Sequence, residues 1–293
     1  MEKISAIIVC TREEGNVQQC LESVNFVDEI VIIDSCATER TLEICRKFTD
    51  RIVSHPWPSY GQQMDYAREL AKNEWVLTLD VNELVSEKLR KNITSALEND
   101  RGKYDAYRLK RHYFYTGQRI NHCWQPEFQI RLYRKSKARW LFRNLHYSPV
   151  LDGMYRDLKG ELEYSPYQDL SQYLHAINSL STIGARERFK KEEAEHPCGL
   201  IFSPLFHFIN LYGLKRGFLD GRSGLVISIL ESYRYFLESA KLREMRNVSP
   251  SQVPGSFTFE PFKHYLGKIK SLIIPAKHQR CGGLLKNSKS PTV

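Results

Sequence analysis

Three oxygen-bearing side chains, Asp80, Asn82 and Glu83, directly follow an apolar run of strand length at residues 75–79. Ligands of open α/β sheets bind beyond the carboxyl ends of the strands, so side chains in this position can face a ligand. Carboxylate and amide oxygens hold hard divalent cations, and such a cation can in turn hold a diphosphate. The same residues also fit an ordinary acidic turn, because Ser86 can cap a following helix. The choice between a metal site and a turn depends on the other motifs.

The elements that would position these residues alternate along the first 100 residues. Short apolar runs predict buried strands of a parallel sheet. These runs are 4–10, 28–34, 51–54 and 75–79. Helical patterns between them predict a doubly wound α/β sheet with right-handed crossovers. Asp34 is the last residue of the second run, and Asp80 directly follows the fourth. We therefore expect the two carboxylates to lie on neighbouring strand tips that open onto one hollow.

The composition is that of a folded protein with an anionic partner. The 293 residues are 42% hydrophobic and carry a formal charge of +9, with an isoelectric point near 9.1. This positive charge favours an anionic binding partner, such as phosphate groups, a membrane surface or nucleic acid. The basic residues are spread along the chain without a zinc-knuckle, RNP-like or helix-turn-helix pattern, so we expect no nucleic-acid partner.

Cysteines and apolar runs bear on the location of the protein. The seven cysteines include no C-x-x-C pair, which favours reduced thiols over disulfides or a zinc site. The apolar run at 4–10 is too short for a signal peptide, and no apolar run reaches the about 18 residues of a spanning helix. The sequence therefore predicts a cytoplasmic protein.

Several stretches, in this order and spacing, resemble family 2 glycosyltransferases of the GT-A fold. The first three are 7–14, 28–41 and 80–83. Within that family the likeness is greatest to the bacterial lipopolysaccharide-core β-1,4-glucosyltransferase branch. It extends to 60–63, 124–132, His146 and 217–222. It covers about residues 1–246, and the set of motifs is far more specific than any one of them.

The resemblance implies a nucleotide-sugar site at the strand ends. The implied nucleotide-sugar-binding residues are Thr11, Glu13, Glu14, Asp34, Ser35 and Asp80. Thr11 and Asp34 would hydrogen-bond the uracil, and Asp80 would face the ribose and the metal. The implied metal is Mn²⁺ or Mg²⁺ bridging the diphosphate, with Asp80, Asn82 and Glu83 as ligands.

The resemblance also implies the catalytic residues, which are Glu127, His146 and Asp80, and the acceptor residues. Glu127 is the candidate general base and His146 its competitor, although a structural histidine held by backbone is an equal alternative. Trp124, Gln129 and Arg131 are the implied acceptor-binding residues. Arg131 would pair with a phosphate, or else be a salt-bridged surface arginine.

The family likeness and the change of pattern along the chain define the expected domains. Residues 1–165 would form the GT-A domain, with a nucleotide-sugar half at 1–100 and an aromatic-rich acceptor half at 101–165. A basic amphipathic helical region at 166–246 and a weakly structured tail at 247–293 would follow. The implied activity is the inverting transfer of a hexose from a UDP-sugar to a lipopolysaccharide or lipooligosaccharide core sugar. The resemblance implies that this hexose is glucose.

The sequence departs from the family pattern at several of these positions. Asn82 replaces an acid, which should weaken the metal site. Met64 and Asp65 replace a basic residue and Asn, which would remove a phosphate contact and add a repulsive carboxylate. Tyr147 removes an acid after His146. Glu127 replaces Asp, and Cys36 replaces a turn glycine. The alternative to an active enzyme is a weakened relative that binds nucleotide or glycolipid as a partner protein.

Two apolar stretches in the helical region, 202–212 and 225–230, flank Lys215, Arg216 and Arg222. They fit two helices packed as a hairpin on the catalytic domain. They equally fit a peripheral face on the anionic cytoplasmic leaflet, where a glycolipid acceptor would lie in the same plane as the active site.

Overall fold

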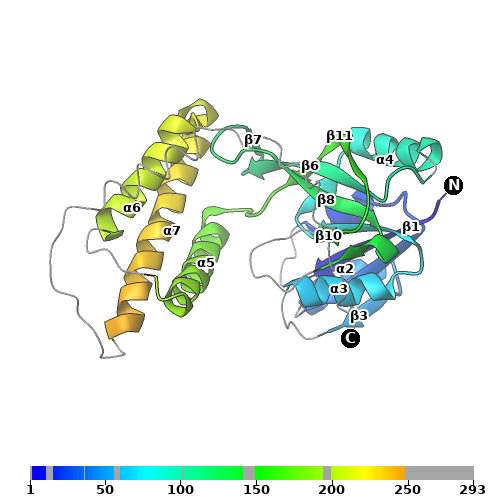
Figure 1. Ribbon diagram of the computed structural model, residues 1–293, viewed down its shortest axis with the longest axis horizontal. Helices are drawn as coiled ribbons and strands as arrows, with labels where there is room; N and C mark the ends of the chain where they lie inside the picture. The colour runs from blue at the N-terminus through cyan, green and yellow to red at the C-terminus, as the bar shows by residue number, and fades with distance from the viewer. Residues whose placement is uncertain are drawn as a thin grey trace, which may run out of the picture.

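The computed structural model consists of an α/β domain and a helical region that stands beside it (Figure 1). The residues that it describes are 2–10, 16–35, 37–55, 60–100, 102–140, 149–193 and 199–247. In chain order the α/β domain contains β1 (Ile4–Cys10), α1 (Val17–Ser23), β2 (Glu29–Asp34), α2 (Glu39–Arg46), β3 (Ile52–Ser54), α3 (Tyr60–Leu70), β4 (Trp75–Asp80), β5 (Glu83–Val85), α4 (Glu87–Asn99), β6 (Ala106–Tyr115), β7 (Gln118–Ile120), β8 (Glu127–Arg134), η1 (Lys135–Lys137), β9 (Ala138–Arg139), β10 (Val150–Leu151) and β11 (Tyr155–Tyr164). The helical region contains α5 (Leu170–Lys190), α6 (Gly199–Phe208), the π-helical η2 (Ile209–Leu214), the 3-10 turn η3 (Gly217–Asp220) and α7 (Gly221–Asn247).

A nine-stranded sheet forms the centre of the α/β domain, in the order β3-β2-β1-β4-β8-β6-β11-β5, with β7 paired to β6. β1 pairs in parallel with β2 and with β4, and β2 pairs in parallel with β3. Beyond β4 the pairing is mixed, because β8 is antiparallel to β4 and β6 whereas β6 and β11 are parallel. The predicted α/β class with a helical C-terminal appendage is confirmed.

Every residue of β1 is buried, because apolar side chains cover both faces of this strand. Ile8 points into a cluster that includes residues of α1 and α4, whereas Ile7 packs with Met64 and Ala67 of α3. A strand covered on both sides favours apolar residues at nearly every position, which explains the apolar run of β1. Its one polar residue, Ser5, donates a hydrogen bond from Oγ to Glu29 Oε2 at 2.5 Å. Ser86 caps α4 as expected, since its Oγ accepts a hydrogen bond from the Leu89 backbone N–H at 3.3 Å.

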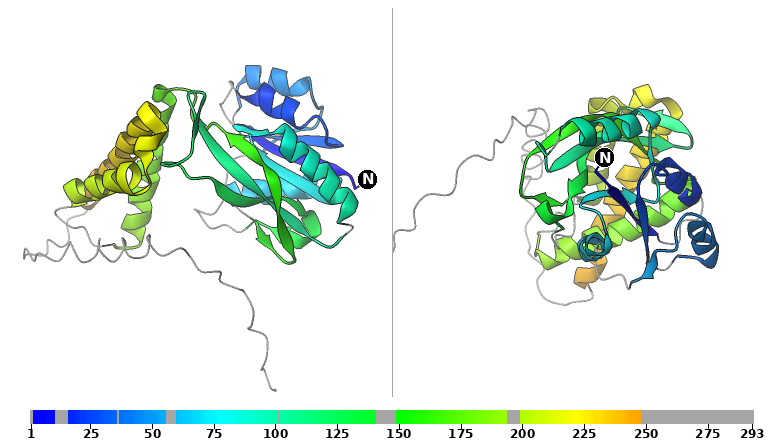
Figure 2. Two further views of the ribbon diagram at one scale, coloured as in Figure 1. Left: turned by 90° about the horizontal axis from the view of Figure 1, so that it is seen from above. Right: turned by 90° about the vertical axis from the view of Figure 1, so that its right-hand side faces the viewer.

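In the helical region, α7 packs against both α5 and α6, and the β6–β7 hairpin reaches across to this unit (Figure 2). An apolar cluster joins the two parts of the molecule; its buried residues are Tyr115, Ile120, Cys123, Tyr173, Ile177, Ile227 and Leu230. The two apolar stretches noted in the sequence thus belong to helices that pack together. Among the helices in the described ranges, none combines the length and apolar character needed to cross a membrane.

Candidate active site

Asp34 and Asp80 end two strands at the same edge of the sheet. β1 lies between these strands, with Cys10 opposite Asp34 and Val9 opposite Asp80. We expected the two strand tips to be direct neighbours, but β1 lies between β2 and β4. The two tips nevertheless lie at the same, carboxyl-terminal end of the sheet. The ends of β2, β1 and β4 form the edge at which open α/β sheets bind ligands.

The turn after β2 is braced from α3. Asp34 Oδ1 accepts a hydrogen bond from the Ala37 backbone N–H at 2.8 Å. Ser35 is 5% exposed, and its Oγ accepts a hydrogen bond from Gln63 Nε2. Gln63 Oε1 is in turn 2.7 Å from His55 Nδ1. Gln63 thus fixes the strand end that carries Asp34, a role that its sequence position does not indicate.

Asp80, Asn82 and Glu83 form one hydrogen-bonded turn. The Asn82 backbone N–H donates to Asp80 Oδ1 at 3.0 Å, and the Asp80 N–H donates to Glu83 Oε2 at 2.9 Å. Burial and then the Glu83 carboxylate raise the pKa of Asp80, against the opposing effects of the Asn82 N–H, Arg131 and Arg111. A cation or a hydroxyl donor placed against Asp80 would therefore be favourable.

Glu83 is fully buried between two arginines. Its Oε1 accepts hydrogen bonds from Arg131 Nη2 at 2.8 Å and from Arg111 Nη1 at 3.2 Å. A buried carboxylate needs such partners, since an uncompensated charge in the interior is costly. The Arg131 side chain is 1% exposed, so the alternative of a salt-bridged surface arginine is correct in the salt bridge and wrong in the surface position. Both carboxylate oxygens of Glu83 are thus engaged, Oε1 by the two guanidinium groups and Oε2 by the Asp80 N–H, so Glu83 is poorly placed as a metal ligand.

The other two expected metal ligands make a weak donor set. Asn82 is 7% exposed, and its Oδ1 accepts a hydrogen bond from Asn16 Nδ2 at 3.0 Å. Within the described ranges, no group of three or more His, Cys, Asp or Glu side chains is placed to hold a metal ion. Hard divalent cations prefer several anionic oxygens. Asp80 supplies one such oxygen donor at this turn, so the residues present fit a divalent cation only poorly.

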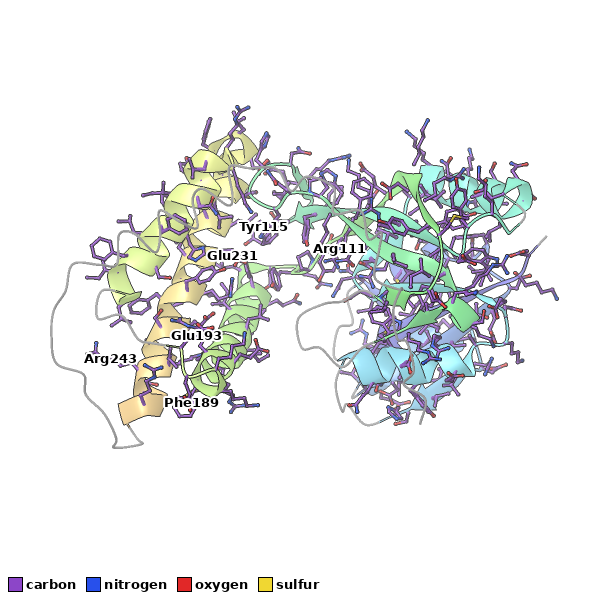
Figure 3. The ribbon with its side chains drawn as sticks, viewed as in Figure 1. Arg111, Tyr115, Phe189, Glu193, Glu231 and Arg243 are labelled. Atoms are coloured by element: carbon purple, nitrogen blue, oxygen red, sulfur yellow. The ribbon has the colours of Figure 1, made fainter. Side chains whose placement is uncertain are left out.

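Glu127 begins β8 opposite Arg111 of β6. Arg111 Nε donates to Glu127 Oε1 at 3.0 Å, and the Tyr113 hydroxyl donates to the same oxygen. Burial alone would raise the pKa of Glu127, but the Tyr113 hydrogen bond and the Arg111 guanidinium outweigh it and lower the pKa. Arg111, labelled in Figure 3, also lies over the Tyr164 ring, 4.3 Å from its centroid. Arg111 thus links Glu127 to the buried Glu83.

Gln129 and Trp124 lie on either side of Glu127 in the chain. Gln129 Oε1 is buried, and no described residue donates a hydrogen bond to it. An unsatisfied buried carbonyl is unfavourable, so this atom fits a ligand hydroxyl. Trp124 is half-buried. Four tyrosine rings have centroids 5.6 to 6.1 Å from that of Trp124: Tyr113, Tyr115, Tyr167 and Tyr173.

Some expected site residues lie outside the described ranges: Thr11, Glu13, Glu14, Cys36, His146 and Tyr147. Two others, Met64 and Asp65, lie in the described part of α3. Met64 is fully buried in the core, and the Asp65 carboxylate accepts hydrogen bonds from Arg68 Nε at 3.0 Å and the Trp140 N–H at 3.2 Å. Met64 therefore offers no contact to a phosphate, as expected, and the pairing of Asp65 with Arg68 offsets the negative charge that was expected to repel one.

Comparison with known proteins places the chain among sugar-transferring enzymes. A Rickettsia typhi protein named as an uncharacterized glycosyltransferase is 27% identical over 292 residues, covering 96% of this chain and 99% of its own. The lipopolysaccharide core biosynthesis glycosyltransferase LpsC of Rhizobium meliloti is 26% identical over 251 residues, covering 82% and 91%. The crystal structure of S. aureus TarS 1–349 aligns with a TM-score of 0.42 at 12% identity, covering 85% and 93%.

The family model described as Glycosyl transferase family 2 matches residues 5–157, which contain the whole edge formed by β2, β1 and β4 and also Arg111 and Glu127. This match spans more than half of the chain. The chain therefore belongs to glycosyl transferase family 2 and is a transferase enzyme.

Proposed function

We propose that this glycosyltransferase moves a hexose, glucose, from a UDP-sugar to a sugar of the lipopolysaccharide core, with inversion at the transferred carbon. The observation that carries the proposal is that Asp34 and Asp80 lie at the same end of the sheet. Glu127 begins β8, the next strand beyond β4, and is held there by Arg111 of β6. The similarity to LpsC of Rhizobium meliloti supports a lipopolysaccharide acceptor.

In this proposal the donor lies over the ends of β2, β1 and β4. Asp34 accepts a hydrogen bond from the uracil N–H, and Asp80 accepts one from a ribose hydroxyl. Asp80 and Asn82 are the residues that would hold a divalent cation, and the chemistry that such a cation would supply is neutralisation of the diphosphate charge. Glu127 takes the proton of the acceptor hydroxyl while that oxygen attacks the anomeric carbon. The bond from this carbon to UDP breaks on the opposite side. Arg111 holds Glu127 oriented and keeps it ionised until it takes the proton.

Isothermal titration with UDP, with and without Mn²⁺, tests the donor site. We expect binding by the wild type and loss of binding in Asp34→Asn. Asp28→Asn is the matched control, because Asp28 accepts the Ile4 backbone N–H at the other end of β1, at 2.8 Å. Absence of UDP binding in both conditions would contradict the donor assignment. Transfer is then measured with a panel of nucleotide sugars and heptose-containing core lipid as acceptor.

One observation supports a second candidate, a weakened relative that binds nucleotide without turnover: Asn82 Oδ1 already accepts a hydrogen bond from Asn16 Nδ2. Asn82→Asp separates the two candidates. In an active enzyme with a retuned site, the wild type transfers sugar and the variant gains Mn²⁺ affinity, since a carboxylate binds the cation more strongly. In a binding protein, the wild type binds UDP and transfers no sugar.

The proposal includes docking on an anionic membrane surface at the inner face of the cytoplasmic membrane. Leu214, Phe218 and Leu219, here called the apolar tip, are 55%, 50% and 56% exposed. Arg216 and Arg222 are exposed beside them in the chain. Apolar side chains flanked by arginines favour the interface of an anionic bilayer.

Flotation with vesicles of phosphatidylethanolamine and phosphatidylglycerol tests the docking at low salt. We expect the wild type to float and Leu219→Ser combined with Phe218→Ser to stay in solution. Ile183→Ser is the control, because Ile183 is equally exposed, at 49%, but lies on α5 away from the apolar tip in the chain. A wild-type protein that does not float contradicts the docking.

A further inference from the structure

The stretch at 217–222 takes no part in the proposed chemistry, yet it contains a buried carboxylate with an unusual set of partners. Asp220 ends η3 and is 2% exposed. Its Oδ1 accepts hydrogen bonds from the Asn121 N–H at 3.0 Å and from His122 Nδ1 at 2.8 Å. Its Oδ2 accepts from the His122 N–H at 3.0 Å and from the Cys123 N–H at 2.9 Å. One side chain of the helical region therefore holds three consecutive residues of the loop between β7 and β8.

Further contacts fasten the same junction. Gln118 of β7 donates from Nε2 to the Asp220 carbonyl at 3.0 Å and accepts from Ser223 Oγ at 2.7 Å. The backbone comes unusually close here. A Cβ on Gly224 would lie 1.9 Å from the Gly217 carbonyl oxygen, and one on Gly217 would lie 3.2 Å from the Cys123 Cβ. Glycine at 224 therefore lets α7 pack directly on η3. Glycine at 217 is required by the Leu211 carbonyl oxygen, from which a Cβ would lie 2.7 Å, and it also lets η3 approach Cys123 of the loop.

The loop that Asp220 holds continues directly into residues assigned to the acceptor. Trp124 follows Cys123, and β8 begins at Glu127. Trp124 lies against Tyr173 of α5, at 5.6 Å between ring centroids, so the helical region also limits the position of this ring. The start of β8 is thus fixed on one side by Arg111 and on the other by the loop bound to Asp220.

We propose that Asp220 is a positioning residue for the acceptor side of the reaction, which fixes Asn121–Cys123 and thereby sets the places of Trp124 and Glu127. This inference rests on the proposed function, since it takes the roles of Trp124 and Glu127 from it. It assigns to the helical region a part in acceptor binding that does not depend on membrane docking.

The charge of Asp220 matters for this role. Burial alone would raise the pKa of Asp220, but the hydrogen bonds from His122 and from the loop N–H groups outweigh it and lower the pKa. The group is therefore ionised at neutral pH, and hydrogen bonds to an ionised acceptor are stronger than neutral ones. An asparagine offers a single acceptor oxygen, so at least one loop N–H would lose its partner and the loop would loosen.

Asp220→Asn tests the inference through a split of kinetic constants. We expect the KM for core lipid to rise roughly tenfold or more, because small displacements of positioning groups are costly, while the KM for the UDP-sugar stays within about twofold. Amide hydrogen exchange at 121–123 should become faster in the same variant. His122→Ala is the milder second variant; it removes one of the four hydrogen bonds from a partly exposed side chain and should shift both readouts in the same direction by less.

Ser223→Ala is the matched control, since it removes the hydrogen bond to Gln118 at the same junction and leaves the carboxylate in place. It should raise the acceptor KM and the exchange rate at 121–123 by much less than Asp220→Asn does. The inference is overturned if amide exchange at 121–123 becomes faster in Asp220→Asn while the KM for core lipid is unchanged. It is also overturned if the KM values for core lipid and for the UDP-sugar rise together. A wild-type protein that shows no transfer at all removes the proposed function instead, and the inference with it.

Discussion

Arg111 and Glu127 face each other across β6 and β8, with Arg111 Nε donating to Glu127 Oε1 at 3.0 Å. Through its Nη1 the same guanidinium reaches the buried Glu83 at 3.2 Å. A single arginine therefore connects the candidate base to the turn that carries Asp80.

The first prediction concerns the pH dependence of transfer. Arg111 helps to lower the pKa of Glu127, so Arg111→Met should raise that pKa. Because Glu127 must be ionised to act as a base, the acid limb of the kcat/KM profile should move to higher pH. Arg108→Met is the control, since Arg108 lies on the same strand but pairs with Asp157 at 2.6 Å. If the acid limb does not move in Arg111→Met, protonation of Glu127 does not control kcat/KM.

The second prediction concerns the identity of the base. Glu127→Gln should lower kcat by roughly 10²- to 10⁴-fold, the usual contribution of a general base, with UDP affinity unchanged. Single-turnover transfer and isothermal titration measure the two effects. Near wild-type transfer in Glu127→Gln, together with loss of transfer in His146→Ala, would reassign the base to the histidine.

The third prediction concerns stability. Glu83→Gln leaves Arg111 and Arg131 without their shared buried carboxylate, so we expect a loss of about 3–5 kcal/mol in the free energy of unfolding. Urea denaturation measures it. Glu87→Gln removes the partner of Arg90 in an exposed ion pair and should leave the urea midpoint unchanged. Equal midpoints in both variants would contradict the structural role of Glu83.

The fourth prediction separates stability from function at Asp80. Its pKa is raised by burial and by Glu83, so the folded state binds the proton more tightly than the unfolded chain. Ionised Asp80 therefore destabilises the fold, increasingly as the pH rises from the ordinary aspartate pKa through the raised one. Asp80→Asn should accordingly unfold at a temperature equal to or above that of the wild type at pH 7, and lose UDP binding. A calorimetric scan in which the variant unfolds earlier than the wild type at pH 7 would contradict this.

The parallel half of the fold was predictable from the sequence. The runs at 4–10 and 75–79 are apolar at all but one position, and 28–34 is apolar at 30–33, which is the pattern of strands buried on both faces. Asp34 and Asp80 were found because each marks an abrupt end to such a run. The strand order was not predictable, since insertion of β8 between β4 and β6 depends on contacts between distant residues.

The polar network of the site was less predictable. Arg111 lies in a strand with several basic residues, and only the register of β6 with β8 distinguishes it from Arg108. Asn16 meets Asn82 across 66 residues of sequence. The burial of Arg131 likewise follows from Glu83, which lies 48 positions earlier in the chain. Such pairings are set by tertiary structure, and local patterns carry no sign of them.

The direct succession of the apolar tip and Asp220 has a geometric consequence. Phe218 and Leu219 immediately precede the carboxylate that grips the β7–β8 loop, so little flexible chain separates the proposed lipid contact from the catalytic face. For a lipid-linked acceptor, the distance between the bilayer and the catalytic site would then be fixed. The enzyme would select acceptor sugars by their distance from the bilayer as well as by their stereochemistry.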